Sequence, residues 1–164
     1  MAKRQRRRQL TDAASCPRFK IHEYEHRSIT GGVLAVDFEM TVGVRQIGLL
    51  QTKTSGSALE VESIAIEDAK FRRCGLGTKL YEAAAKWGCA NGMKLTSDVL
   101  RTTDSQGFWE KQVKKGRARC MVGASQKAST QDTDGPRMGR GGCGMYQLIS
   151  CSSTDLSRRR RRKK

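Results

Sequence analysis

The stretch from residue 66 to residue 88, IEDAKFRRCGLGTKLYEAAAKWG, constrains the fold of this 164-residue chain more than any other part of it. Its apolar side chains recur at the spacing of one helix face, at i, i+4, i+7, i+8 and i+11. They are Leu76, Leu80, Ala83, Ala84 and Trp87. The spacing predicts an amphipathic helix that ends at Asn91-Gly92, a pair typical of helix ends.

This helix is flanked by two candidate strands. Residues 58–66 (ALEVESIAI) place apolar side chains on one face and Glu60 and Glu62 on the other, as in a half-buried strand. The alternation changes phase near Ser63, which indicates a β-bulge. Residues 93–98 (MKLTSD) predict a strand after the helix, so the three elements form a βαβ crossover with parallel strands.

The remaining elements predict a mostly antiparallel sheet. Apolar segments at 19–27, 32–40 and 46–52 are separated by turn-prone sequences, as in an antiparallel meander. After the crossover we expect a helix, a strand, a polar flexible loop and a final strand, at 104–116, 117–123, 124–142 and 144–150. The expected fold is α/β (α+β), a mixed, mostly antiparallel sheet with flanking helices and one parallel crossover. We assign these elements to a single domain at 18–151, since 164 residues are a usual size for one domain.

Two runs of basic residues lie outside that domain, in arms at 1–17 and 152–164. The runs at 3–8 and 158–164 carry 12 of the net 16 positive charges, which leaves +4 for the rest of the chain. Like charges repel and bury nothing, so we expect disordered arms that contact RNA or DNA. A solubilising tail or a nuclear-import signal explains such runs about equally well. The candidate nucleic-acid contacts are Lys3, Arg4, Arg6, Arg7, Arg8, Arg158, Arg159, Arg160, Arg161, Arg162, Lys163 and Lys164.

The sequence favours an intracellular protein, either cytoplasmic or associated with nucleoprotein. Its apolar runs are shorter than the ~20 residues that cross a membrane, and its basic start lacks the apolar stretch of a secretory signal. An organellar presequence or a virion protein also fits. The six cysteines form no CxxC pair and are irregularly spaced, so we expect reduced thiols, most of which serve as small core residues. They are Cys16, Cys74, Cys89, Cys120, Cys143 and Cys151.

The turn before the predicted helix has the composition of a phosphate site. The first backbone N–H groups of a helix are unpaired and lie at its positive end, where they bind phosphate. Gly75 and Gly77 allow the backbone to approach an anion closely, and Arg72 and Arg73 add positive charge. The turn therefore suits a pyrophosphate, although glycines that serve only helix packing would give the same pattern.

The segment Arg72 to Gly77 (RRCGLG) resembles the R/Q-x-x-G-x-G/A pattern of the GNAT superfamily of N-acyltransferases. GFWEKQVKKGRARC at 107–120 resembles the second marker of that family, and the order of elements over roughly 18–151 is similar as well. The resemblance implies acetyl-CoA as cofactor, with its pyrophosphate at this turn and its pantetheine arm along the preceding strand. The implied contacts are Ile64, Ala65, Ile66, Arg72, Arg73, Cys74, Gly75, Leu76, Gly77 and Thr78.

The resemblance leaves the catalytic groups open. Many GNAT enzymes use a tyrosine of the second marker as general acid, but the matching residue is Trp109, which cannot donate a proton in that role. Tyr81 and Tyr146 are alternatives that the sequence does not place in space. A general base must take a proton from the acceptor amine. Candidate carboxylates are Glu60, Glu62 and Asp98, for which a solvated position is an equally good explanation.

Residues 22–26 spell HEYEH, which matches the HExxH signature of zinc hydrolases. That chemistry needs a helix, which brings both histidines to one face. In the strand predicted here, His22 and His26 would lie ~13 Å apart, too far for one zinc ion. We therefore expect surface histidines and no metal site.

Two functions remain open on sequence alone. The first is an acetyl-CoA-dependent N-acetyltransferase that acts on an amine and associates with nucleic acid or nucleoprotein. The second is a non-catalytic subunit with the same fold, anchored by its arms in a nucleoprotein assembly such as a ribosome or virion. Gly75 and Gly77 favour the enzyme, since a scaffold has less need of close backbone approach to an anion.

Deletion of residues 158–164 tests the phosphate role of the arms. Each phosphate neutralised by a protein cation releases counterions, so removal of these seven charges should flatten the salt dependence of nucleic-acid binding. The measurement is the slope of log Kd against log salt concentration for the full and shortened chains. An unchanged slope would reject the role.

Overall fold

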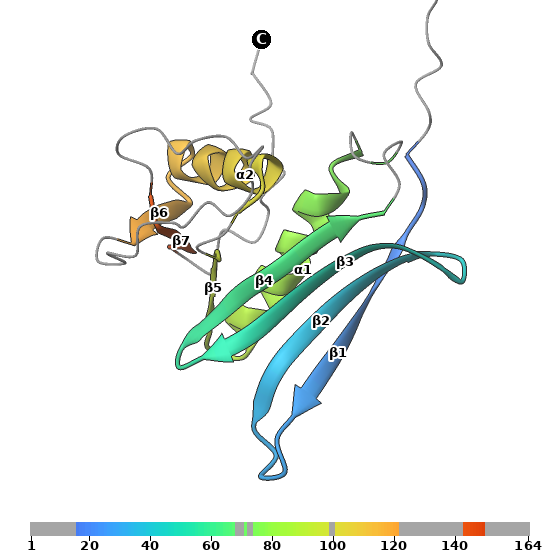
Figure 1. Ribbon diagram of the computed structural model, residues 1–164, viewed down its shortest axis with the longest axis horizontal. Helices are drawn as coiled ribbons and strands as arrows, with labels where there is room; N and C mark the ends of the chain where they lie inside the picture. Colours follow the sequence, from blue (N-terminus) through green and yellow to red (C-terminus); the bar gives the residue numbers. More distant parts are fainter. Residues whose placement is uncertain (1–15, 68–70, 72–73, 99–100, 122–142, 150–164) are drawn as a thin grey trace, which may run out of the picture.

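The computed structural model describes residues 16–67, 71, 74–98, 101–121 and 143–149 (Figure 1). Both basic runs, the loop predicted at 124–142, and Arg72 and Arg73 lie outside these residues. The described elements follow the predicted order. They are β1 (Lys20–Arg27), β2 (Val33–Val42), β3 (Arg45–Ser55), β4 (Ala58–Ile66), α1 (Leu76–Ala90), β5 (Lys94–Thr96), α2 (Thr103–Lys114), β6 (Ala118–Met121) and β7 (Met145–Leu148).

The strands form one sheet in the order β1-β2-β3-β4-β5-β7-β6. The β4–β5 pair is parallel, and the other neighbours are antiparallel. This confirms the predicted mixed sheet with one parallel crossover. The register between β3 and β4 shifts at Gln51/Thr52, opposite the segment from Val61 to Ser63, which confirms the bulge inferred from the change of phase.

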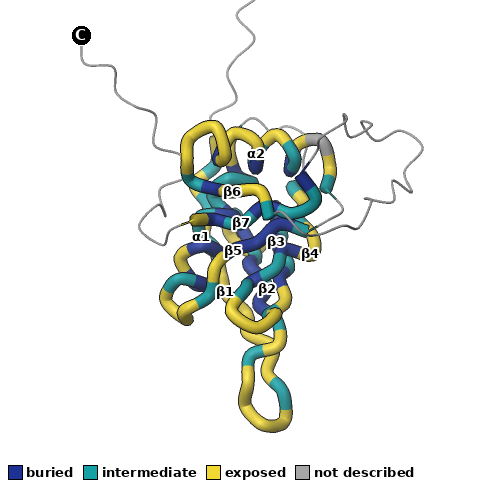
Figure 2. Tube along the Cα trace, turned by 90° about the vertical axis from the view of Figure 1, so that its left-hand side faces the viewer, coloured by how far each residue is buried: buried dark blue, intermediate teal, exposed yellow. Residues whose placement is uncertain are grey.

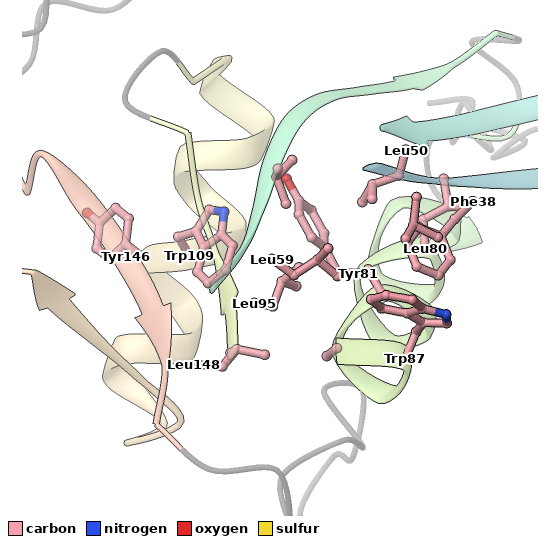
Figure 3. Packing of buried hydrophobic residues seen from close by; sticks show 14 of the residues in the cluster. Phe38, Leu50, Leu59, Leu80, Tyr81, Trp87, Leu95, Trp109, Tyr146 and Leu148 are labelled. Atoms are coloured by element: carbon pink, nitrogen blue, oxygen red, sulfur yellow. The ribbon is translucent and has the colours of Figure 1, made fainter. Parts of the chain in front are cut away.

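The hydrophobic core lies between α1 and the sheet (Figure 3). Phe38, Leu50 and Leu59 of the sheet are fully buried, and they belong to the same cluster as Leu80 of α1. The predicted stripe is confirmed, because four of its five residues are buried and Ala83 packs partly buried against the same cluster. Among the described residues, no helix has the length and hydropathy needed to span a membrane.

Both helices lie on one face of the sheet. The ring of Tyr81 in α1 stacks on that of Phe108 in α2, with centroids 4.1 Å apart. Trp109 of α2 stacks on Tyr146 of β7 and is fully buried. This aromatic cluster, formed by these four residues, joins α1, α2 and the C-terminal strand into one layer.

Strand β1 forms the outer edge of the sheet, and its hairpin with β2 is exposed at the lower end of Figure 2. Its side chains are exposed, except for the half-buried Ile21. As predicted, the histidines of the HExxH segment lie on a strand. Nε2 of His22 lies 3.2 Å from Oγ1 of Thr41, and Nε2 of His26 lies 3.1 Å from Oδ2 of Asp37.

The prediction of reduced thiols is wrong for the described cysteines. Disulfides join Cys16 to Cys74 and Cys120 to Cys143, and Cys89 is also disulfide-bonded. The fold brings the Cα atoms of Cys16 and Cys74 to 5.5 Å although 58 residues separate them in sequence. The irregular spacing of the cysteines in the sequence therefore did not indicate which of them form disulfides. The expected burial is also wrong for Cys16 and Cys120, which are exposed.

Arg101 connects the end of β5, the start of α2 and the approach to β7. Its guanidinium donates hydrogen bonds to the side chains of Gln106 and Ser97, at 2.7 and 3.2 Å. It also donates to three backbone carbonyl oxygens, those of Asp98, Cys143 and Gly144. A planar group with five N–H donors is needed to satisfy acceptors in so many directions.

We expect Arg101→Ala to lower the free energy of unfolding by about 2–4 kcal/mol, because several acceptors lose a charged donor at once. Arg101→Lys should be destabilised nearly as much, since one ammonium cannot replace the fork of donors. Urea unfolding followed by circular dichroism measures both. A loss below about 0.5 kcal/mol in the alanine variant would show that the network contributes little.

Candidate cofactor site

The site begins where two parallel strands separate. β4 pairs with β5 over three residues, from Ala58↔Lys94 to Glu60↔Thr96. β5 then ends at Thr96, whereas β4 continues to Ile66. In the described strands, residues 61–66 of β4 therefore have no partner on the side of β5. Their backbone groups on that side are available to a ligand.

A cavity of about 820 Å³ lies beside this free edge. Its volume falls within the ~300–1,000 Å³ range of small-molecule sites. Six of the residues that the sequence assigned to cofactor binding line it, namely Ile64, Ala65, Ile66, Gly75, Gly77 and Thr78. Five further residues complete the described wall, namely Tyr81, Thr102, Asp104, Ser105 and Phe108.

Gly75 forms the N-cap of α1 in the left-handed conformation, with φ 70° and ψ 19°. A Cβ built there would meet no atom within 4 Å, so its conformation and not close packing requires glycine. At Gly77 a Cβ would meet Ile64 Cδ1 at an ordinary 3.7 Å. The explanation of these glycines by packing alone is therefore not supported.

The start of α1 has the electrostatic character of an anion site. No side chain caps it among the described residues, and its first turn contains no acidic residue. Its first N–H groups lie at the positive end of the helix dipole. Two other residues assigned to the cofactor from the sequence, Cys74 and Leu76, are not among those that line the cavity. Leu76 is buried in the core and Cys74 is held in its disulfide.

Tyr81 and Ser105 place two hydroxyl groups at the wall formed by α1 and α2. Their oxygen atoms lie 2.9 Å apart, and both side chains are buried. Burial raises the pKa of Tyr81, although the Ser105 hydroxyl, the Trp109 indole and the Arg101 charge act in the opposite direction. The phenol therefore remains protonated at neutral pH.

The sequence offers Tyr81 as a candidate acid without giving its position in space. One signal was available, because Tyr81 follows Gly77 by four residues and so lies on the same helix face one turn further from the glycine turn. Its partner Ser105 gave no such signal. The two residues are 24 positions apart, and only the packing of α1 against α2 brings them together.

The other predicted catalytic residues do not line the cavity. Val61 is buried in the core, so its neighbours Glu60 and Glu62 point to the opposite face of the sheet. There both carboxylates approach the Nζ atom of Lys53, at 3.8 and 3.5 Å. The hydroxyl of Tyr146 accepts a hydrogen bond from Gln106 at 2.9 Å and belongs to the aromatic cluster.

The described elements agree with the fold that the sequence resemblance implies: they form a seven-stranded, mostly antiparallel sheet with one parallel pair. No family model and no curated protein matches the chain. Searches of solved structures find similarity to acetyltransferases. One is the ribosomal-protein-S18-alanine N-acetyltransferase from Escherichia coli, at 17% identity and a TM-score of 0.45, over 54% of this chain and 55% of that one.

Two further structures show a similar degree of likeness. The IAA acetyltransferase from Bacillus cereus has 22% identity and a TM-score of 0.43, over 53% of this chain and 57% of that one. A Bacillus anthracis protein assigned as a streptothricin acetyltransferase was solved with acetyl coenzyme A. It has 16% identity and a TM-score of 0.43, over 65% of this chain and 82% of that one. The chain spans about half the length of the first two.

The two glycines of the turn should respond differently to alanine. Gly75→Ala forces a side chain into the left-handed region and should lower the free energy of unfolding by about 1–2 kcal/mol. Gly77→Ala, in the first turn of α1, has room for its Cβ and should be neutral or slightly stabilising. Urea unfolding of both variants is the measurement. Equal losses in the two variants would contradict this assignment.

Proposed function

We propose that the chain binds acetyl-CoA in this cavity and transfers the acetyl group to an amine. One observation carries the proposal: the free edge of β4 and the uncapped start of α1 border the same cavity. A cofactor with a diphosphate and an amide-containing arm needs both features, an anion site and a row of backbone partners. The family resemblance in the sequence supports the same assignment.

The pyrophosphate would bind at the start of α1. Gly75, Gly77 and Thr78 border the cavity there, and the left-handed turn lets the backbone approach the ligand without a Cβ in the way. Arg72 and Arg73 stay proposed contacts by virtue of their place in the sequence.

The amide-containing arm would lie along Ile64, Ala65 and Ile66. An extended ligand that adds to a free strand edge gains backbone hydrogen bonds in the manner of an additional strand. The splitting of β4 from β5 provides such an edge within the sheet rather than at its margin.

Acetyl-CoA would supply a thioester whose acetyl group passes to the amine. At the cavity wall, Tyr81 holds a proton on its phenolic oxygen and can donate it to the departing thiolate, while Ser105 fixes the position of that oxygen. The carboxylate of Glu62 stays our proposed base, for an amine that approaches from the sheet face opposite α1. Glu60 and Tyr146 stay candidates of lower rank, since Glu60 is less exposed than Glu62 and Tyr146 is buried.

The alternative is a structural subunit of a nucleoprotein assembly. The two basic runs favour this alternative. So does the burial of Trp109, which occupies the position of the general-acid tyrosine in many members of the family that the sequence resembles. In either case we propose RNA or DNA as the partner of the arms and an intracellular location. A test of acetyl-CoA binding separates the two functions.

Isothermal titration with acetyl-CoA should show saturable binding near one site per chain. Acetyl-CoA at 100 times its dissociation constant should add about 2.7 kcal/mol to the free energy of unfolding, because it binds only the folded state. Gly77→Ala should bind more weakly, since its new Cβ borders the anion site. The matched control is Gly107→Ala, an exposed position in α2 with open space around it, which should bind like the unmodified chain.

Two results would count against the proposal. Absence of binding at millimolar acetyl-CoA would favour the structural subunit. Equal weakening by both alanine substitutions would place the binding elsewhere than at the start of α1.

A further inference from the structure

A disulfide holds the residue that precedes the anion site. Cys74 is adjacent to Gly75, which caps α1 and lines the cavity. Its partner Cys16 lies four residues before β1, the outermost strand of the meander. The bond thus connects the turn at the cavity to a part of the sheet that the cavity does not otherwise touch.

Among the described residues no side chain caps α1, and the contacts that hold this turn besides the disulfide are noncovalent. The half-buried Phe71 and Cys74 rest against the core. The Cys16–Cys74 disulfide adds a covalent restraint to these contacts.

The same disulfide is open to reagents. Cys16 is exposed and Cys74 is half-buried, so a dissolved thiol can attack the bond. The Cys120–Cys143 disulfide joins an exposed residue to a buried one, at β6 and just before β7. Neither of its cysteines borders the cavity, which makes it a matched control.

We propose that the Cys16–Cys74 disulfide is a redox modification site that sets the affinity of the cavity for its cofactor. This inference rests on the proposed function. In the oxidised protein the turn is held ready to bind, and in the reduced protein it is released. A small dithiol supplies two electrons and two protons, so that Cys16 and Cys74 become thiols and the dithiol becomes a disulfide. A disulfide of the same class reverses the step.

The size of the effect follows from the population of the competent turn. The apparent Kd equals the intrinsic Kd divided by the competent fraction. If the reduced turn is competent about a tenth of the time, the Kd for acetyl-CoA rises about tenfold. We expect a change of this order, without a change in stoichiometry.

The test compares the full chain with two double variants, Cys16→Ser/Cys74→Ser and Cys120→Ser/Cys143→Ser. Acetyl-CoA is titrated into each before and after treatment with dithiothreitol, and alkylation followed by mass spectrometry reports which disulfides are open. Far-UV circular dichroism checks that each sample is folded. The dithiothreitol-treated unmodified chain keeps the test decisive if the first variant does not fold.

Three patterns distinguish the outcomes. The proposal is supported if loss of the Cys16–Cys74 disulfide, by reduction or by mutation, raises the Kd for acetyl-CoA about tenfold. The Cys120/Cys143 variant should bind acetyl-CoA as tightly as the unmodified chain and should still lose affinity in dithiothreitol. Equal affinity in all folded samples, or equal weakening by both double variants, overturns the redox site and leaves the cofactor site intact. Absence of acetyl-CoA binding in every sample, oxidised chain included, overturns the proposed function itself.

Discussion

The short pairing between β4 and β5 creates the free strand edge that borders the cavity. Three residue pairs join the strands, after which β5 ends and the chain turns through Arg101 into α2. β4 continues for six residues whose backbone, among the described strands, is unpaired on that side. Because unpaired backbone groups away from water cost free energy, such an edge is retained where a ligand or solvent satisfies it. The crossover then places the start of α1 at the same end of β4, which brings an anion site next to a row of backbone partners.

Two residues of the aromatic cluster, Tyr81 and Phe108, form part of the cavity wall beside the free edge of β4. Tyr81, Phe108, Trp109 and Tyr146 connect α1, α2 and β7, so that α2 is fixed relative to the free edge. Trp109 contributes as a fully buried ring that stacks on Tyr146. Tyr81 lines the cavity instead, with its hydroxyl 2.9 Å from that of Ser105. A position that the family resemblance associates with acid catalysis therefore serves packing here, and the phenol lies on the neighbouring helix.

Local patterns predicted the framework well because strands, helices and glycine turns are properties of neighbouring residues. The stripe of α1, the bulge near Ser63 and the crossover could all be derived in this way. The same patterns failed for features that depend on distant residues. The partners Cys16 and Cys74 are 58 positions apart, and the contact of Lys53 with Glu60 and Glu62 depends on the register between β3 and β4. The six wall residues assigned from the sequence come from two short continuous segments, which explains why they could be found.

The Cys16–Cys74 bond also has a mechanical consequence for the meander. It closes a covalent ring around β1, β2, β3 and β4 and the turn into α1. An edge strand ordinarily frays independently of the rest of a sheet. Here, displacement of the first residues of β1 pulls on the end of α1 that borders the cavity. We therefore expect motions at the outer margin of the sheet and at its internal split to be coupled, although β2 and β3 lie between β1 and β4.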